Sequence, residues 1–212
     1  MKKAAVLLVL SLTGLLSCTQ QSDEKSLFES MEANTQWPSY RGYFANGYMK
    51  NTSLPDSFNV ESGFNVQWDI EIPGMGLSCP VIWDENIFIT TAISEEDKEG
   101  YLPGMYGDIA PVADSSEHEW VLYCINKEDG KIKWEKTLHQ GIPSVRRHPK
   151  SSHANTSVAT NGKQVVVFLG SEGLYCYDMK GSLLWERDFG LIKSAWNIVP
   201  SAEWEFTSSP LI

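Results

Sequence analysis

Residues 122–135 read LYCINKEDGKIKWE, and residues 174–186 read LYCYDMKGSLLWE. Each stretch has a short alternating apolar run, a polar turn with a glycine, and a second run that ends in Trp-Glu. Residues 64–69, FNVQWD, repeat the closing run alone. Apolar residues that alternate with polar ones predict strands, so each of the two long stretches predicts an antiparallel hairpin.

A second hairpin is predicted ahead of each of these two. Residues 78–82, 156–160 and 208–212 (SCPVI, TSVAT and SSPLI) align as short strands. The first two are followed by a turn and a run of β-branched or aromatic residues, and the second of these turns is Asn161-Gly162, a strong hairpin signal. The repeating unit is therefore four antiparallel strands in about 50 residues, which is the size of a propeller blade.

These units predict an all-β fold, a β-propeller of four-stranded antiparallel blades. Because a four-stranded sheet cannot bury both faces alone, each blade must stack on its neighbours through large apolar side chains. We expect Trp68, Trp134 and Trp185 to dock successive blades, each with its indole N–H on a backbone carbonyl. Residues 37–212 hold about two complete and two partial blades, so we expect them to be the N-terminal part of a longer ring.

The turn of the repeated hairpin has a pattern of its own. In the first copy it is Cys124-x-Asn126-x-x-Asp129-Gly130-x-x-x-Trp134, and the second copy keeps it with one residue deleted. This pattern resembles the repeat of the pyrroloquinoline-quinone-like (PQQ-like) β-propeller family, usually Ala-x-Asp-x-x-Thr-Gly-x-x-x-Trp. In that resemblance the cysteine of each copy takes the place of the small alanine, so we expect it to be a buried filler.

Residues 37–42, WPSYRG, resemble the Trp-Pro-x-Phe-Arg-Gly opening of many bacterial propeller lipoproteins of this family. The resemblance covers about residues 37–212 and implies a complete ring of about eight blades.

The first residues predict export. Lys2 and Lys3 precede an apolar run, residues 4–16, that has the length of a signal peptide and is too short to span a bilayer. This run ends in Leu-Leu-Ser-Cys, which resembles a bacterial lipobox and implies a lipid-modified Cys18. The alternative is an ordinary secretory signal in which this cysteine is incidental.

The lipobox defines three segments. Residues 1–17 are expected to be a lipoprotein signal peptide, and residues 18–36 the lipidated cysteine and a polar, flexible tether. Residues 37–212 are expected to be the propeller part. Thr19 after the cysteine resembles lipoproteins of the outer membrane, so we expect an exported chain, lipid-anchored at the periplasmic face of the outer membrane or elsewhere in the cell envelope.

Charge and cysteines narrow the range of partners. The chain has a formal net charge of −10, and loss of Lys2 and Lys3 with the signal peptide would make it −12. An acidic surface repels phosphate backbones, so no nucleic acid is expected as a partner. Three widely spaced cysteines remain beyond Cys18, which suggests neither a disulfide framework nor a structural zinc site.

The order of strands predicts one plain and one elaborated face. In an antiparallel four-stranded blade, the first and third turns lie at one end, and the second turn and the links between blades lie at the other. The turns at the first end are tight. Residues 93–119, 139–155 and 189–206 are the long connections at the second end, where binding residues usually lie.

Residues 146–155, RRHPKSSHAN, are a cationic segment in an acidic chain and lie on this elaborated face. We take them as a candidate site for a small anionic or carbohydrate ligand. The alternative is a solvated loop, or salt bridges to the acidic residues 94–97. No metal site is predicted, since His148 and His153 lack a third ligand at fixed spacing. The candidate ligand-binding residues are Arg146, Arg147, His148, Lys150, His153, Asn155, Trp196 and Trp204.

Two functions follow from the family resemblance. The expected one is a non-catalytic, membrane-anchored binding or scaffold module of the cell envelope, similar to propeller lipoproteins of outer-membrane assembly, with envelope proteins as partners and no cofactor. The alternative is a fragment of a PQQ-dependent dehydrogenase that oxidises alcohols or sugars with PQQ and calcium. The sequence shows no adjacent cysteine pair and no recognisable calcium set, and no catalytic residue is assigned.

Overall fold

The structure is a computed structural model that describes residues 35–50, 52–94, 111–112, 114–192 and 206–212. The predicted signal peptide, Cys18 and most of the predicted tether lie outside these residues, as do Trp196 and Trp204. No helix that could cross a bilayer occurs in the described parts of the chain.

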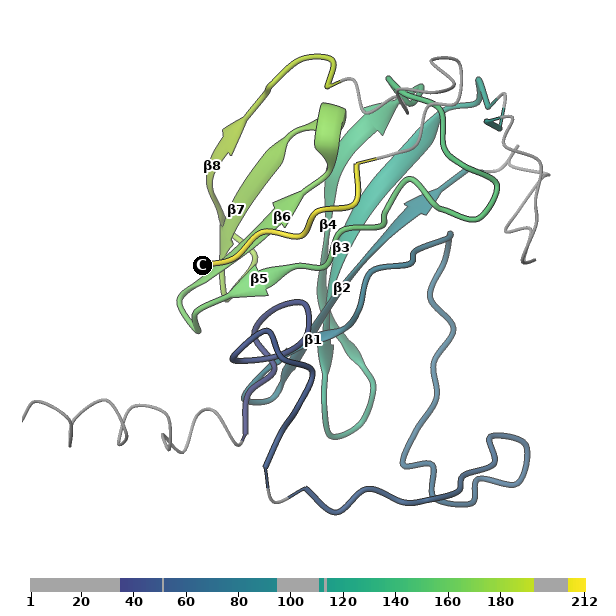
Figure 1. Ribbon diagram of the computed structural model, residues 1–212, viewed down its shortest axis with the longest axis vertical. Helices are drawn as coiled ribbons and strands as arrows, with labels where there is room; N and C mark the ends of the chain where they lie inside the picture. Colours follow the sequence, from purple (N-terminus) through teal and green to yellow (C-terminus); the bar gives the residue numbers. More distant parts are fainter. Residues whose placement is uncertain (1–34, 51, 95–110, 113, 193–205) are drawn as a thin grey trace, which may run out of the picture. The chain divides into compact units, whose positions relative to one another are not determined.

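Two four-stranded antiparallel sheets make up the fold (Figure 1), and in each sheet the strands lie in sequence order. The all-β prediction and the four-stranded antiparallel unit are confirmed, whereas the described residues show two such sheets and no closed ring. The first sheet contains β1 (Val81–Trp83), β2 (Asn86–Ile93), β3 (His118–Asn126) and β4 (Ile132–Gly141). The second contains β5 (Ala159–Thr160), β6 (Gln164–Phe168), β7 (Leu174–Asp178) and β8 (Leu183–Arg187), with a 3₁₀ helix, η2 (Gly170–Glu172), between β6 and β7.

The repeated cysteine and tryptophan occupy the same register in both sheets. Cys124 pairs with Trp134 across β3 and β4, and Cys176 pairs with Trp185 across β7 and β8. A register shift follows the cysteine in both copies. Both thiols are fully buried, because a small side chain opposite the indole leaves room for the larger ring. Burial raises the pKa of Cys124 to about 11.

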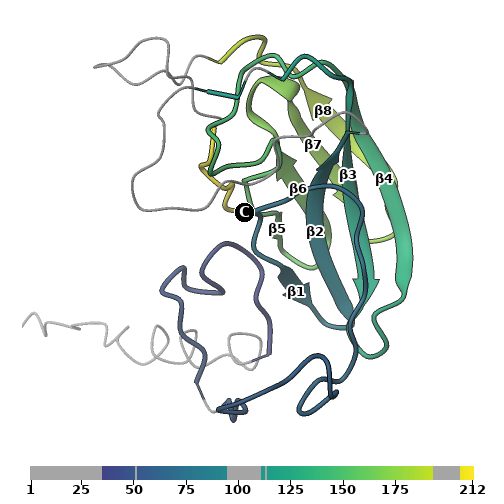
Figure 2. The same cartoon turned by 90° about the vertical axis from the view of Figure 1, so that its right-hand side faces the viewer.

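One hydrophobic core joins the two sheets (Figure 2), which face each other. The first sheet contributes Phe88, Trp120, Leu122 and Cys124, all fully buried. The second sheet contributes residues from the alternate positions of its strands, Val165, Val167, Tyr175 and Tyr177. The first sheet therefore contributes one face to this core, and the second sheet contributes the opposite face of its equivalent strands. This is expected when each sheet stacks on the next in a constant direction.

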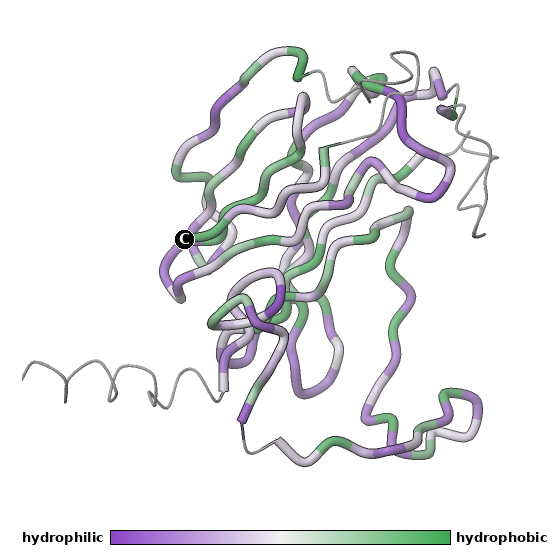
Figure 3. Tube along the Cα trace, in the orientation of Figure 1, coloured by the Kyte–Doolittle hydropathy of each residue, from purple (hydrophilic) through white to green (hydrophobic). Residues whose placement is uncertain are grey.

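The other face of the first sheet is also covered. Val121, Tyr123 and Ile125 of β3 form a second buried cluster, and Trp68, Ile70 and Ile72 pack against it. The segment that contains the isolated closing run, residues 64–69, thus covers the face of the first sheet that points away from the second sheet. Figure 3 shows hydrophobic residues recurring along the strands of both sheets.

Each tryptophan that has a following sheet contacts the same turn of that sheet. The Trp68 indole N–H donates to the Lys127 carbonyl at 2.8 Å, and the Trp134 indole N–H donates to the Met179 carbonyl at 3.2 Å. The glycine of each turn lies under the ring. A Cβ built on Gly130 would come within 2.7 Å of Trp68, and one on Gly181 within 3.0 Å of Trp134. Both glycines have a positive φ, so the turn needs glycine for two reasons.

The N-terminal segment is tied to both sheets. Trp37 exchanges two backbone hydrogen bonds with Ile82 of β1, at 2.9 and 2.8 Å, and the Pro38 carbonyl accepts from the Thr160 amide of β5 at 2.8 Å. Gln36, at the end of the predicted tether, is 6% exposed and bonds to the backbone and side chain of Asp84. Gln36, the last residue of the predicted tether, is therefore packed against the turn between β1 and β2.

Candidate functional site

The three aligned segments, the first two of which lead into β1 and β5, are linked by a repeated hydroxyl contact. Ser157 Oγ accepts a hydrogen bond from the Cys79 amide at 2.9 Å, and Ser209 Oγ accepts one from the Ser157 amide at 2.9 Å. These three positions are equivalent in the predicted alignment of residues 78–82, 156–160 and 208–212. Residues 208–212 therefore lie against residues 156–160 in the same way as residues 156–160 lie against residues 78–82.

The residue before each of the first two positions makes a matching contact within its own sheet. Ser78 Oγ donates to the Thr90 carbonyl at 3.2 Å, and the Thr156 hydroxyl donates to the Phe168 carbonyl. Each bond fixes the start of the first strand against the second strand. These bonds fix the positions of the first two aligned segments where they approach each other.

A cavity of about 590 Å³ lies where these segments converge. We name it the A-strand cavity, because each segment aligns with the first strand (strand A) of the repeating four-stranded unit. It lies at the end of the sheets that carries the long connections, because the first strands begin there. Its lining combines equivalent residues of the three segments with one residue from the N-terminal segment and three from the link between the sheets. The lining residues are Tyr40, Leu77, Cys79, Lys150, Ser151, Asn155, Ser157, Thr207, Ser208 and Ser209.

The chemistry of the A-strand cavity suits an anion with several oxygen atoms. Lys150 is the one charged side chain among the described lining residues, and no ion pair of Lys150 occurs within the described chain. Six hydroxyl groups and the Asn155 amide offer both donors and acceptors. An ammonium surrounded by neutral polar groups favours a carboxylate or phosphate over a cation.

The loop that carries Lys150 is held in place by its own polar groups. The Lys150 amide donates to His148 Nδ1 at 3.0 Å, and the Ser151 amide donates to the His148 carbonyl at 2.8 Å. Asn155 Oδ1 accepts from the Ser152 amide at 2.9 Å, and Asn155 Nδ2 donates to the Ser152 carbonyl at 2.6 Å. Burial and the nearby Lys150 lower the pKa of His148.

The structure separates the residues predicted to bind one ligand. Lys150 and Asn155 line the A-strand cavity, whereas Arg146 is exposed. Arg147 is fully buried and donates to the Ser151 carbonyl at 3.2 Å, so it holds the loop from inside. His153 is also buried.

His153 lies in a compact group with Asp114 and His118. One ligand-type atom from each of the three side chains lies within 4.8 Å of the others. His118 Nε2 is 3.2 Å from Asp114 Oδ2. Burial acts to raise the pKa of Asp114, but hydrogen bonds from Ser116 and the two nearby imidazoles hold it below its ordinary value.

Sequence reasoning missed Asp114 and His118. Asp114 lies near the end of the long connection between β2 and β3, and His118 is the first residue of β3. His153 lies in the link between the sheets, so only the folded sheets bring the three together. The i, i+4 spacing of Asp114 and His118 is the one signal in the sequence, and it is common in loops that bind nothing.

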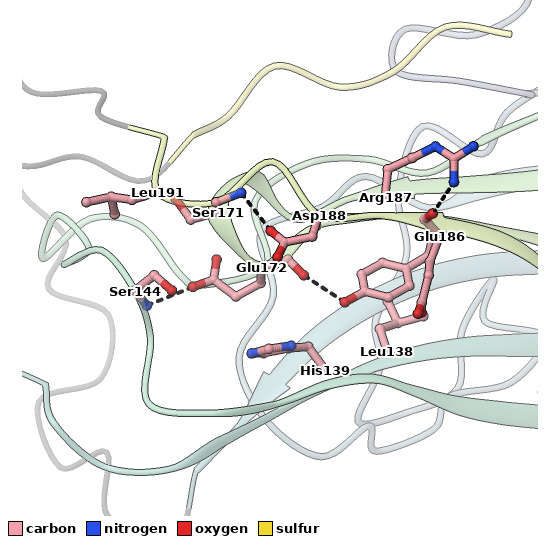
Figure 4. Close-up of a pocket in the computed structure, with 12 residues that line it drawn as sticks. Leu138, His139, Ser144, Ser171, Glu172, Glu186, Arg187, Asp188 and Leu191 are labelled. Carbon is pink, nitrogen blue, oxygen red and sulfur yellow. Dashed lines mark hydrogen bonds between the residues drawn. The ribbon is translucent and has the colours of Figure 1, made fainter.

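A second cavity, of about 480 Å³, lies between β4, η2 and β8 (Figure 4). Two of its three acidic side chains, Glu172 and Asp188, are engaged with the chain itself. Glu172 Oε1 accepts from the Ser144 amide at 2.8 Å, and Asp188 Oδ1 accepts from the Gly190 amide at 2.6 Å. These bonds anchor the connections around the cavity, so we take the A-strand cavity as the candidate binding site.

The calcium ion required by the PQQ-dependent dehydrogenase alternative does not fit the described lining of the A-strand cavity. Calcium takes six to eight oxygen ligands, carboxylates foremost. No Asp or Glu is among the described residues of this lining, and Lys150 would repel the ion. Comparison of the chain with protein-family models and with curated proteins gave no match to either.

Proposed function

We propose that residues 37–212 are consecutive blades of a PQQ-like β-propeller that serves as a non-catalytic, lipid-anchored binding module of the bacterial cell envelope. The observation that carries this proposal is the repeated contact of a tryptophan with the turn of a following sheet. Trp68 meets the turn of the first sheet as Trp134 meets the turn of the second. A contact that recurs with the same donor and the same turn generates a stack with a constant rotation, which is how propeller blades are arranged.

The face of the second sheet that looks away from the first supports the same arrangement. Trp185, the third copy of the docking tryptophan, is 37% exposed, and apolar neighbours on and after β8 are exposed as well. An apolar hollow of about 450 Å³ lies beside them. A further four-stranded sheet would cover this surface, as the second sheet covers Trp134. The exposed apolar side chains are Leu183, Leu184, Phe189 and Leu191.

The module binds a small anionic ligand, or the acidic group of an envelope partner, in the A-strand cavity. Lys150 supplies the charge, and hydroxyls of the second and third aligned segments, of Ser151 and of Tyr40 supply orientation. Binding between successive blades is consistent with a scaffold function, because the ligand would contact several sheets at once.

Titration calorimetry of the full chain tests the ligand class. D-glucuronate and inorganic phosphate are the anionic probes, and D-glucose is the neutral control. We expect at least one anionic probe to bind and D-glucose not to bind. Lys150→Glu should weaken binding at least tenfold, because it replaces the attracting charge by a repelling one. Lys163→Glu, a charge change in the exposed turn at the other end of the sheets, should leave the affinity unchanged.

Equal affinity of the wild type and Lys150→Glu would refute the cavity as the binding site. A second titration, with PQQ and calcium and an artificial electron acceptor, tests the enzymatic alternative. Alcohol- or sugar-dependent reduction of the acceptor would replace the scaffold function by a dehydrogenase. Incorporation of labelled palmitate that is lost in Cys18→Ala tests the lipid anchor.

A further inference from the structure

We propose that Asp114, His118 and His153 bind one divalent transition-metal ion, for which zinc is the best fit. The group combines two imidazoles and one carboxylate, with ligand-type atoms within 4.8 Å of one another. The His118 and Asp114 side chains are only 2% and 7% exposed. This site is separate from the A-strand cavity, since none of its three residues lines that cavity.

The orientation of His118 presents a lone pair to the site. Its Nδ1 is 3.0 Å from the Ser116 carbonyl oxygen, which can only accept a hydrogen bond, so Nδ1 carries the proton. In the neutral ring, Nε2 therefore has a lone pair. A backbone carbonyl that fixes the far nitrogen is the usual support of a metal-bound histidine.

Asp114 is oriented in a complementary way. Its Oδ1 accepts hydrogen bonds from the Ser116 amide at 3.0 Å and from the Ser116 hydroxyl at 2.6 Å. Its Oδ2 is buried, accepts no hydrogen bond from the described residues, and lies 3.2 Å from His118 Nε2. Two ligand atoms at about 2.0 Å from a tetrahedral zinc ion are about 3.3 Å apart, so this separation is close to that of a metal-bound pair.

A neutral imidazole and a carboxylate oxygen that face each other at this distance repel unless a positive charge lies between them. A metal ion supplies that charge and joins both lone pairs. The alternative source is a proton on His118 Nε2, which would make the contact a simple ion pair. The two differ in the role of the third residue, because only a metal also recruits His153.

His153 is held at the site by its main chain and its ring. The Trp120 indole N–H donates to the His153 carbonyl at 2.8 Å, and the rings of His118 and His153 meet edge to face with centroids 4.9 Å apart. Since Trp120 is fully buried, it fixes this part of the link between the sheets. A metal here would join the connection before β3 to the segment that carries Lys150 and Asn155.

The donor set selects the kind of metal. Imidazole nitrogen suits zinc, copper, iron and nickel, whereas calcium and magnesium prefer all-oxygen sites. Three protein ligands leave a fourth position for water in a tetrahedral zinc site. We therefore expect saturable binding of zinc and cobalt, and none of calcium.

Metal titration of the full chain, first stripped with a chelator, tests the proposal. We expect one equivalent of Zn²⁺ by equilibrium dialysis and visible d–d absorption bands with Co²⁺. Asp114→Asn and His118→Gln should each weaken zinc binding at least tenfold, as loss of a direct ligand costs at least as much as loss of a supporting residue. His139→Gln is the matched control, because its ring also contacts Trp120, at 5.3 Å, from outside the group.

Absence of saturable zinc binding and of cobalt bands in the wild type would establish the ion pair instead and overturn the proposal. Equal loss of zinc affinity in His139→Gln and His118→Gln would also overturn it, since disturbed packing would then explain both. The wild-type cobalt spectrum decides the question even if a variant fails to fold. Anion binding in the A-strand cavity, measured through Lys150→Glu, is a separate outcome.

Discussion

Replacement of Trp134 by alanine tests how the sheets are held together. Its ring packs on Gly181 and in the common core, and its indole N–H bonds to the Met179 carbonyl. Removal of a fully buried Trp costs about 3–5 kcal/mol, and Trp134 is partly buried, so packing accounts for about 2 kcal/mol. The lost hydrogen bond adds about 1 kcal/mol. We expect Trp134→Ala to lower the free energy of unfolding by about 3 kcal/mol, and Trp134→Phe by about 1 kcal/mol.

Urea denaturation followed by far-ultraviolet circular dichroism measures these changes. Trp185→Ala is the internal control, because it occupies the same register in the second sheet but is 37% exposed. We expect it to cost less than about 1 kcal/mol. Equal destabilisation by Trp134→Ala and Trp185→Ala would refute the reasoning, since the effect would then arise within one sheet and not between two.

Three further outcomes are expected. Gly181→Ala should destabilise more than Gly190→Ala in the same urea assay, because both have a positive φ but only the first Cβ would meet the indole. Iodoacetamide should label the exposed Cys79 in the native protein and leave Cys124 unlabelled until it unfolds, as mass spectrometry of peptides would show. Burial, reinforced by nearby negative charge, raises the pKa of Tyr175 to about 12. Its contribution to stability is therefore present below pH about 10 and lost as the pH rises toward 12, since the unfolded chain ionises first. A flat stability profile over that range in wild type would contradict the Tyr175 assignment.

The strands could be predicted well because their pattern is local. The repeated stretches at 122–135 and 174–186 contain the turns between β3 and β4 and between β7 and β8. Alternating apolar residues, a turn glycine and a β-branched run each depend on neighbours in sequence. The predicted strand at 156–160 is shorter in the structure, where β5 is Ala159–Thr160, since the residues before it form contacts between sheets.

The candidate site residues were harder to predict because burial in an irregular link follows no period. Arg146 and Arg147 are adjacent and both cationic, yet one is exposed and the other fully buried. Nothing in the sequence distinguishes them. The grouping of Asp114 with His153 depends on the way two connections from different parts of the chain meet above β3.

The hydrogen bonds of Trp37 and Pro38 set an order of events for the folding chain. The N-terminal segment is synthesised first, but one of its two partners, Thr160, belongs to the second sheet and is made much later. Closing so long a loop is entropically costly. The segment therefore makes all of its hydrogen bonds only after both hairpin pairs have formed. The segment that is synthesised first is thus among the last to reach its native conformation. Slow hydrogen exchange at the Thr160 amide would indicate that its docking is complete.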